Sequence, residues 1–229
     1  MQAVILAGGI GTRLRPLTEE IPKPMVHVQD KPFLQYLLEL LKSYNMIDEV
    51  LLLVSYLGDQ IEEYFKDGKS LGVSIKYSYE KSPLGTGGAL KNAESKLKNE
   101  FLLLNGDTYL PINYNSLIKS FYKSDKQGLI VAYDNSQWIV PNNLAVNESN
   151  IVISYNKKEQ TGLTHVDAGA IMLKREVLRY IPEGCICSLE EETFCKLIAK
   201  RELSAFPTNQ RFYDMGSFQG LETIRSVLR

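Results

Sequence analysis

The chain has 229 residues, with 26 Lys and Arg against 27 Asp and Glu, and 44% of its residues are hydrophobic. A chain of this length buries about 70% of its extended surface on folding, so it needs no disulfides to hold a core. The near-neutral charge excludes a generally basic, DNA-coating surface, and we expect no nucleic-acid partner. No run of 18 apolar residues and no signal-peptide pattern is present, which predicts a cytoplasmic protein without a membrane span.

The three cysteines, Cys185, Cys187 and Cys195, lie close together in the sequence. An odd, clustered set is typical of reduced cytosolic thiols rather than of a disulfide framework. A zinc site would need a fourth ligand, and His27 and His165 lie in unrelated motifs. We therefore expect no zinc.

The predicted elements begin with the apolar run Ala3–Ala7, which is followed by glycines and indicates a strand buried on both faces. Pro32 then opens a helix whose apolar side continues to Tyr44, because proline is well tolerated at a first helical position. Further strands are expected at Val50–Ser55, Val73–Tyr79, Phe101–Leu104 and Gly128–Tyr133. Further helices are expected around Asp59–Phe65, from Gly85–Gly88 through Lys98, and around Asn115–Ser124.

The later half has strands closer together in sequence, which indicates an antiparallel part of the sheet. These strands are Leu144–Val146, Ile151–Tyr155 and Ala168–Leu173. Ser188 and Glu191 form a capping-box pattern that predicts a helix through Ala199, and a last helix is expected over 218–228. The whole pattern predicts one α/β domain over residues 1–229, with a Rossmann-like, open, mixed but mainly parallel sheet flanked by helices. In such sheets, ligands bind beyond the carboxyl ends of the strands.

A glycine-rich loop follows the first strand directly. Gly8, Gly9 and Gly11 allow backbone N–H groups to approach an anion closely, and Arg13 and Arg15 add guanidinium donors. The loop therefore favours a nucleoside phosphate as ligand.

Two other phosphate-binding patterns fit this loop less well. The Walker pattern is absent because no Gly-Lys-Ser/Thr follows. The dinucleotide pattern begins with Gly9 and Gly11, but Leu14 occupies its third glycine and Pro16 interrupts the helix. Asp30 lies where a ribose-binding acid would be, so this alternative stays open, as does a plain structural turn.

The segment LAGGIGTRLRPLTEEIPKPM, at residues 6–25, resembles the signature of sugar-1-phosphate nucleotidyltransferases. The resemblance continues through PLGTGGAL (83–90), LLNGDTYL (103–110), ISYNKK (153–158), THVDAGAIML (164–173) and RFYDMGSFQGLE (211–222). Within that family, KPF, YSYE and NGDT are most similar to guanylyltransferases of the D-glycero-alpha-D-manno-heptose 1-phosphate type. The resemblance implies a single nucleotidyltransferase domain without the C-terminal β-helix domain of bifunctional relatives.

The implied reaction joins a nucleoside triphosphate to a sugar 1-phosphate and releases pyrophosphate, with Mg²⁺ as cofactor. The resemblance gives Arg13, Lys23 and Asp107 catalytic roles and assigns Asp107 and Asp214 to the metal. Without it, Lys23 reads as a solvated loop lysine and Asp107 as a turn residue. The resemblance places nucleotide contacts at Leu6, Ala7, Gly8, Gly9, Gly11, Thr12, Arg13, Lys23, Glu80, Pro83, Gly85, Thr86, Gly87, Asn105 and Gly106.

For the sugar phosphate, the resemblance implies contacts at Tyr155, Lys157, Asp167 and Gly169. The lysine motif can be aligned in two ways, so Lys158 remains a rival to Lys157. Asn156 replaces the acidic residue usual there, a departure that weakens the alignment at this point.

The resemblance also implies that Glu80 faces the base of the nucleotide, and a carboxylate there favours GTP. Guanine presents two adjacent N–H groups that a carboxylate accepts, whereas uracil and thymine present one N–H between two carbonyls that a carboxylate repels. A mismatched buried polar group costs about 1–3 kcal/mol. An exposed carboxylate at the end of a strand is the other interpretation of Glu80.

Several alternatives stay open at this point. The substrate pair is GTP with a heptose 1-phosphate, GTP with mannose 1-phosphate, or UTP or dTTP with glucose 1-phosphate. A regulatory nucleotide-binding subunit without activity is disfavoured because the catalytic residues are retained. The family is often dimeric or larger, so a homo-oligomer is also open. Trp138 and Asn143 lie in an irregular stretch where they contact the sugar or belong to the ordinary surface.

Overall fold

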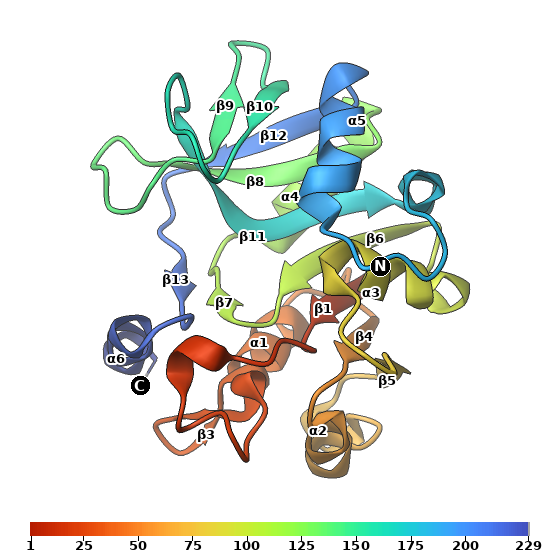
Figure 1. Cartoon of the computed structure of the whole chain (residues 1–229), viewed down its shortest axis with the longest axis vertical. Coiled ribbons are helices and arrows are strands. Elements are labelled where there is room, and N and C mark those ends of the chain that lie inside the picture. Colours follow the sequence, from red (N-terminus) through yellow and green to blue (C-terminus); the bar gives the residue numbers. More distant parts are fainter. Residues whose placement is uncertain (229) are drawn as a thin grey trace.

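The computed structural model describes residues 1–228 and contains a central sheet with helices on both faces (Figure 1). The helices are α1 (Phe33–Lys42), α2 (Gly58–Phe65), α3 (Gly85–Asn92), α4 (Tyr114–Ser124), α5 (Cys195–Ala199) and α6 (Phe218–Val227). The strands are β1 (Gln2–Leu6), β2 (His27–Val28), β3 (Lys31–Pro32), β4 (Glu49–Val54), β5 (Ile75–Tyr79), β6 (Glu100–Asn105), β7 (Thr108–Tyr109), β8 (Gly128–Asp134), β9 (Leu144–Val146), β10 (Val152–Tyr155), β11 (His165–Lys174), β12 (Leu203–Thr208) and β13 (Tyr213–Asp214). Within residues 1–228, no helix is both long and apolar enough to cross a bilayer.

The central sheet has nine strands, and its order confirms the expected mixed architecture. Seven strands run β10-β9-β11-β6-β1-β4-β5, and β8 pairs with both β11 and β12. Strands β6, β1, β4 and β5 are mutually parallel, so their carboxyl ends meet at one edge of the sheet. Strand β11 runs antiparallel to both β6 and β8 and joins this parallel part to the rest.

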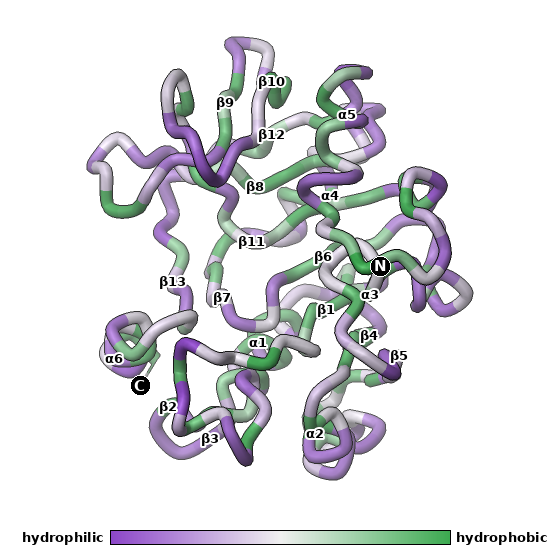
Figure 2. Tube along the Cα trace, viewed as in Figure 1, coloured by the Kyte–Doolittle hydropathy of each residue, from purple (hydrophilic) through white to green (hydrophobic). Residues whose placement is uncertain are grey.

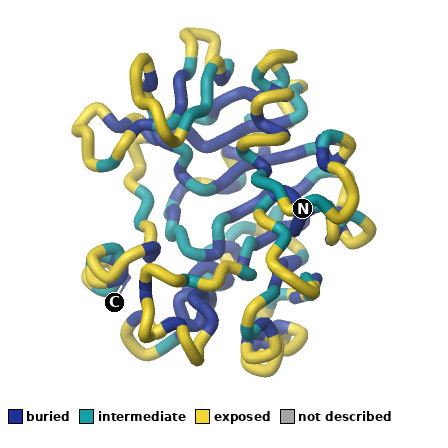
Figure 3. Tube along the Cα trace, viewed as in Figure 1, coloured by how far each residue is buried: buried dark blue, intermediate teal, exposed yellow. Residues whose placement is uncertain are grey.

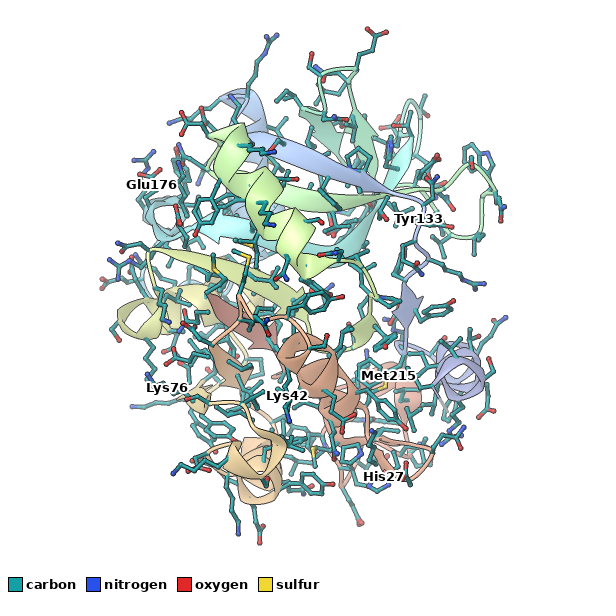
Figure 4. The ribbon with its side chains drawn as sticks, turned by 180° about the vertical axis from the view of Figure 1, so that it is seen from behind. His27, Lys42, Lys76, Tyr133, Glu176 and Met215 are labelled. Atoms are coloured by element: carbon teal, nitrogen blue, oxygen red, sulfur yellow. The ribbon has the colours of Figure 1, made fainter. Side chains whose placement is uncertain are left out.

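The core is divided by the sheet into two apolar layers, which explains why the strands are apolar on both faces. In β1, Ala3 and Ile5 belong to one layer and Val4 to the other. The first layer packs against α1, α2, α4 and α6, and the second against α3 and α5. Figures 2 and 3 show the hydrophobic, buried strands inside and hydrophilic, exposed loops around them, and Figure 4 shows α1 and α4 crossing the far face. Each fully buried Leu or Phe contributes about 1.5–3 kcal/mol relative to an exposed one.

Some predicted elements differ from the structure. The first helix begins at Phe33 rather than at Pro32, because Pro32 pairs with His27 in a short ladder. Helix α3 starts at Gly85 itself and ends at Asn92, before the expected end at Lys98. The helix predicted from Ser188 exists, but residues 190–194 form a π-helical turn. Strand β12 was not predicted; it lies at the sheet edge and contains Pro207, a residue that central strands disfavour.

Candidate active site

A cavity of about 600 Å³ lies where the parallel strands end. Leu6 closes β1, Leu53 lies near the end of β4, Glu80 follows β5 and Asn105 closes β6, and all four line it. Thirteen of the residues expected to contact the nucleotide line the cavity: Leu6, Gly8, Gly9, Gly11, Thr12, Arg13, Lys23, Glu80, Pro83, Gly85, Thr86, Asn105 and Gly106. This is the position that open α/β sheets provide for ligands.

Two expected residues, Ala7 and Gly87, are not among the residues that line the cavity. Ala7 is only 1% exposed and belongs to the core. Gly87 is buried in α3, where its N–H donates to the carbonyl of Cys187 at 3.0 Å. Neither residue therefore faces the cavity, and both belong to the buried structure that supports its loops.

The glycine loop, residues 8–11, is held in place by the conformation of Gly11 and by one hydrogen bond from Thr18. Gly11 has φ +70°, a left-handed conformation that disfavours a side chain, and the Thr18 hydroxyl donates to its carbonyl at 2.8 Å. The chain then forms a 3₁₀ turn over Thr12–Leu14, with Leu14 fully buried. This turn positions Arg13 on the cavity wall.

Glu80 is a half-buried carboxylate on the same wall. Its backbone N–H continues the β4 ladder by donating to Val54, and its Oε2 accepts the Leu84 N–H at 2.8 Å. Burial raises the pKa of Glu80, although the Leu84 hydrogen bond works in the opposite direction. The fixed orientation of this carboxylate excludes the alternative of a freely exposed strand-end residue.

Lys23 and Asp107 form an ion pair at the centre of the site. Lys23 lies on a 3₁₀ turn preceded by Pro22 and is only 9% exposed. Its ammonium donates to Asp107 Oδ2 at 2.5 Å. Lys23 is thus not the solvated loop lysine of the alternative interpretation.

A two-strand ladder brings Asp107 and Asp214 together, although they are far apart in sequence. Strand β7 pairs with β13 so that Thr108 faces Asp214, and the Met215 N–H donates to the Asp107 carbonyl at 2.9 Å. Partial burial and then the negative charge of Asp107 raise the pKa of Asp214. Two adjacent carboxylates that repel each other suit a divalent cation, and Mg²⁺ commonly takes one or two carboxylates plus phosphate oxygens. The residues present therefore fit Mg²⁺.

A second cavity of about 670 Å³ adjoins the first. Arg13, Asn105 and Asp107 line both cavities. Asp214 and the expected sugar-phosphate residues Lys157, Asp167 and Gly169 also line the second one. The two cavities therefore meet at Arg13 and Asp107.

Asp167 and Gly169 lie at an irregularity in β11, where the register against β8 shifts between Asp167 and Ile171. Gly169 has φ +79°, and a side chain there would meet Asn105 and Thr108. Asp167 Oδ1 accepts the Gly169 N–H at 2.9 Å. Burial raises the pKa of Asp167 to about 6. The bulge therefore turns a carboxylate toward the second cavity.

Tyr155 was expected to contact the sugar phosphate, but it is not one of the cavity-lining residues. Its hydroxyl donates to Asp167 Oδ2 at 3.2 Å. Its ring packs edge-on against Phe194. Tyr155 thus positions Asp167 from behind.

Glu190 is a site residue that the sequence reading missed. It lines the first cavity, accepts hydrogen bonds from Thr86 and Ser188, and pairs with Lys157 at 3.0 Å. Burial opposes its charge, but the Ser188 hydrogen bond and the Lys157 charge outweigh it and lower the pKa of Glu190. The usable signal was the Ser188 capping pattern, which placed a helix start here but drew attention to Glu191. The rival Lys158 is absent from the lining of either cavity.

Together, a glycine loop at the carboxyl edge of the sheet and two cavities that share Arg13, Asn105 and Asp107 fit a transferase with two adjoining substrate sites. The chain belongs to the nucleotidyl transferase family, whose model matches residues 2–227. This membership confirms the resemblance found in the sequence and excludes the dinucleotide-binding alternative.

Individual relatives are similar over most of the chain. D-glycero-alpha-D-manno-heptose 1-phosphate guanylyltransferase from Campylobacter jejuni is 42% identical over 189 residues, which cover 77% of each chain. Mannose-1-phosphate guanylyltransferase from Mycobacterium tuberculosis is 34% identical over 95% of this chain, and the match covers 61% of that longer protein. The crystal structure of HddC from Yersinia pseudotuberculosis has a TM-score of 0.83 and 29% identity, covering 100% of this chain and 99% of that one, and it has also been solved with GMP-PN.

Proposed function

We propose that the protein transfers GMP from GTP to D-glycero-α-D-manno-heptose 1-phosphate, giving a GDP-heptose and pyrophosphate. The observation that carries the proposal is the shared wall of the two cavities, where Arg13, Asn105 and Asp107 face both. A reaction between two phosphorylated molecules needs such a wall, because the attacking and the attacked phosphate must be held next to each other.

The chemistry requires little covalent help from the protein. An oxygen of the sugar phosphate forms a bond to the α-phosphorus of GTP, and the bond from that phosphorus to the bridging oxygen breaks. Pyrophosphate leaves with the electron pair. A phosphate monoester has its second pKa near 6, so the attacking oxygen is already ionised at neutral pH and needs no general base.

Three cations of this chain would perform the electrostatic work. Arg13 holds the β- and γ-phosphates, Lys23 faces the α-phosphate, and Lys157 binds the sugar phosphate. Their positions support this assignment, because Arg13 and Lys23 line the first cavity while Lys157 lines the second. Asp107 orients the Lys23 ammonium through the ion pair. Positioning of this kind supplies most of the rate enhancement in phosphoryl-type transfer.

Asp107 and Asp214 would hold Mg²⁺. When bound there, the ion supplies charge neutralisation to the phosphates that meet at the shared wall. The raised pKa of Asp214 beside Asp107 supports this assignment, since the two carboxylates repel each other without a cation.

Glu80 supports guanine as the base. The Leu84 N–H occupies one side of Oε2, and the carboxylate retains acceptor capacity toward the cavity. Two adjacent N–H donors of guanine match this carboxylate, whereas the carbonyls of uracil oppose it. The identity of 42% to a heptose 1-phosphate guanylyltransferase supports the same base and the manno-configured sugar.

A matrix of pyrophosphate release, with four nucleoside triphosphates and Mg²⁺ against a panel of sugar 1-phosphates, tests the proposal. The highest kcat/KM is expected for GTP with the heptose 1-phosphate, followed by GTP with mannose 1-phosphate. A preference for mannose 1-phosphate would correct the sugar alone. A preference for UTP with glucose 1-phosphate would overturn both the base and the sugar.

A further inference from the structure

The loop between β8 and β9 forms part of the second cavity and projects from the edge of the molecule (Figure 1). Ile139, Val140 and Pro141 line the cavity and give that side of it an apolar surface. The polar groups of the cavity lie on β11 and on the segment that carries Asp214. Sugar sites combine a few oriented polar groups with apolar surface of this kind.

The base of the loop is fixed by two buried asparagines. Asn135 is 2% exposed and Asn142 is 3% exposed, and the Asn135 amide donates to Asn142 Oδ1 at 2.8 Å. Asn135 also accepts the Ile139 N–H at 2.9 Å, and Asn142 donates to the Leu163 carbonyl at 3.0 Å. Both ends of the loop are therefore anchored to the core, so the loop holds a defined shape.

Trp138 directly precedes Ile139 in this fixed loop and lies just beyond the residues that line the cavity, in an unfavourable setting. Its φ is +52°, a left-handed conformation that costs free energy for any residue with a Cβ, and the residue is 68% exposed. Among residues 1–228, no aromatic or cation–π partner and no hydrogen bond to its side chain is found. Folding alone would favour glycine here, because glycine adopts positive φ freely and exposes no ring. Among residues 1–228, six other non-glycine residues have positive φ and line neither cavity, so the strain at Trp138 points to a function only together with its exposed, unpartnered ring beside the cavity lining.

We propose that Trp138, together with its neighbour Ile139, is the specificity rim of the sugar site and contacts the apolar C–H face of the bound sugar. This inference rests on the proposed function, because it takes the second cavity as the sugar 1-phosphate site. The phosphate would bind at the charged end of the cavity near Lys157 and Arg13, and the carbon side of the sugar would face the apolar segment 139–141. The rim thus distinguishes sugars by the shape of their apolar C–H face, while the contacts to the phosphate are the same for every sugar 1-phosphate.

The sequence provides a direct probe, since Trp138 is the only tryptophan. The protein is loaded with Mg²⁺ and α,β-methylene GTP, whose α–β bridge is not cleaved, and mannose 1-phosphate or the heptose 1-phosphate is added while calorimetry measures binding. Tryptophan emission is expected to shift to shorter wavelength as the sugar phosphate saturates, and to stay unchanged with the nucleotide alone. Binding by calorimetry without a change in emission would overturn the rim and leave the proposed function standing. Absence of sugar 1-phosphate binding would overturn both.

Variants separate a binding role from a structural one. Trp138→Gly is expected to raise the KM for the sugar 1-phosphate about five-fold, which corresponds to about 1 kcal/mol, with the KM for GTP unchanged. Its melting temperature is expected to be equal or higher, because glycine relieves the positive φ. Trp138→Phe should restore most of the KM, and Ile153→Ala, at an exposed residue of β10 outside the loop between β8 and β9, serves as the control. An unchanged sugar KM, or an altered oligomeric state of Trp138→Gly in gel filtration, would contradict the inference.

Discussion

Replacing Asp107 by Asn tests the centre of the site, because the change removes one negative charge and preserves the size of the side chain. In the protein, the Lys23 side chain is 11% exposed and that of Asp107 is 32% exposed. Breaking a fully buried ion pair costs about 3–5 kcal/mol, and the partial exposure of Asp107 reduces the expected loss to about 1–2 kcal/mol. A domain of ordinary stability has about 5–15 kcal/mol, so the variant should fold.

The effect of Asp107→Asn on activity should be much larger than its effect on stability. Under the proposed assignment, the variant loses one of two carboxylates for Mg²⁺ and the group that pairs with Lys23, so pyrophosphate release should fall at least about 1,000-fold, or about 4 kcal/mol. Asp125→Asn makes the same chemical change at a side chain that is 98% exposed, and should leave turnover unaltered. Thermal melting verifies folding. A folded Asp107→Asn protein with turnover within about ten-fold of the parent would refute the metal and positioning roles.

Asp214→Asn provides a second measurement with the opposite effect on stability. Partial burial and the charge of Asp107 raise the pKa of Asp214, which means that its ionised form is disfavoured in the folded protein. Removing that charge is therefore expected to maintain or raise the melting temperature near pH 7 while turnover is lost. A variant that loses activity only because it unfolds would contradict this assignment.

The remaining predictions concern the base and the sugar. Glu80→Gln should lower the ratio of kcat/KM for GTP over UTP by about ten-fold, because an amide suits uracil better than a carboxylate does; an unchanged ratio would contradict the role of Glu80. Lys157→Ala should raise the KM for the sugar 1-phosphate more than Lys158→Ala does, and the reverse order would assign the phosphate to Lys158. Asp167 has its pKa raised from 3.8 to about 6 by burial, so it binds protons more readily in the folded protein than in the unfolded chain. Its contribution should make stability fall as the pH rises from about 4 through 6, by at most about 3 kcal/mol, and Asp167→Asn should lack this component in melts across that range.

Much of the fold was predictable because its strongest signals are local. The strands β1, β4 and β6 are continuous apolar runs, and the structure buries both of their faces between helices. Elements whose signals are weak were missed. Strand β12 has a proline within six residues, and β7 and β13 have two residues each, which is too short for a periodic pattern.

The residues of the site also differ in how well the sequence predicts them. The first cavity is lined largely by loops that directly follow parallel strands, so its position was predictable from the strand ends, whereas most of its individual residues were predicted from the family motifs. Glu190 was missed because it belongs to a π-helical turn that lies 104 residues after Thr86 in the chain. Its role in the site depends on its contacts with Thr86 and Lys157. A carboxylate in a run of three glutamates carries no distinguishing pattern before the chain folds.

The pairing of β7 with β13 has a consequence for how the reaction is assembled. Asp107 follows the core strand β6, whereas Asp214 lies beside it through the pairing of β13 with β7, with Met215 and α6 packed in the same core layer. Two residue pairs and the hydrogen bond from the Met215 N–H to the Asp107 carbonyl hold this ladder, and the fully buried Met215 side chain anchors it in the core. Met215→Ala should therefore lose a larger fraction of its turnover than of its free energy of unfolding. The reason is that loss of the anchor separates Asp214 from Asp107 while the nine-strand sheet persists. The decisive comparison is the Mg²⁺ concentration that gives half-maximal turnover, which should rise in Met215→Ala and stay constant in the exposed control Val227→Ala. Equal Mg²⁺ dependence in both variants would show that the ladder does not control the metal site.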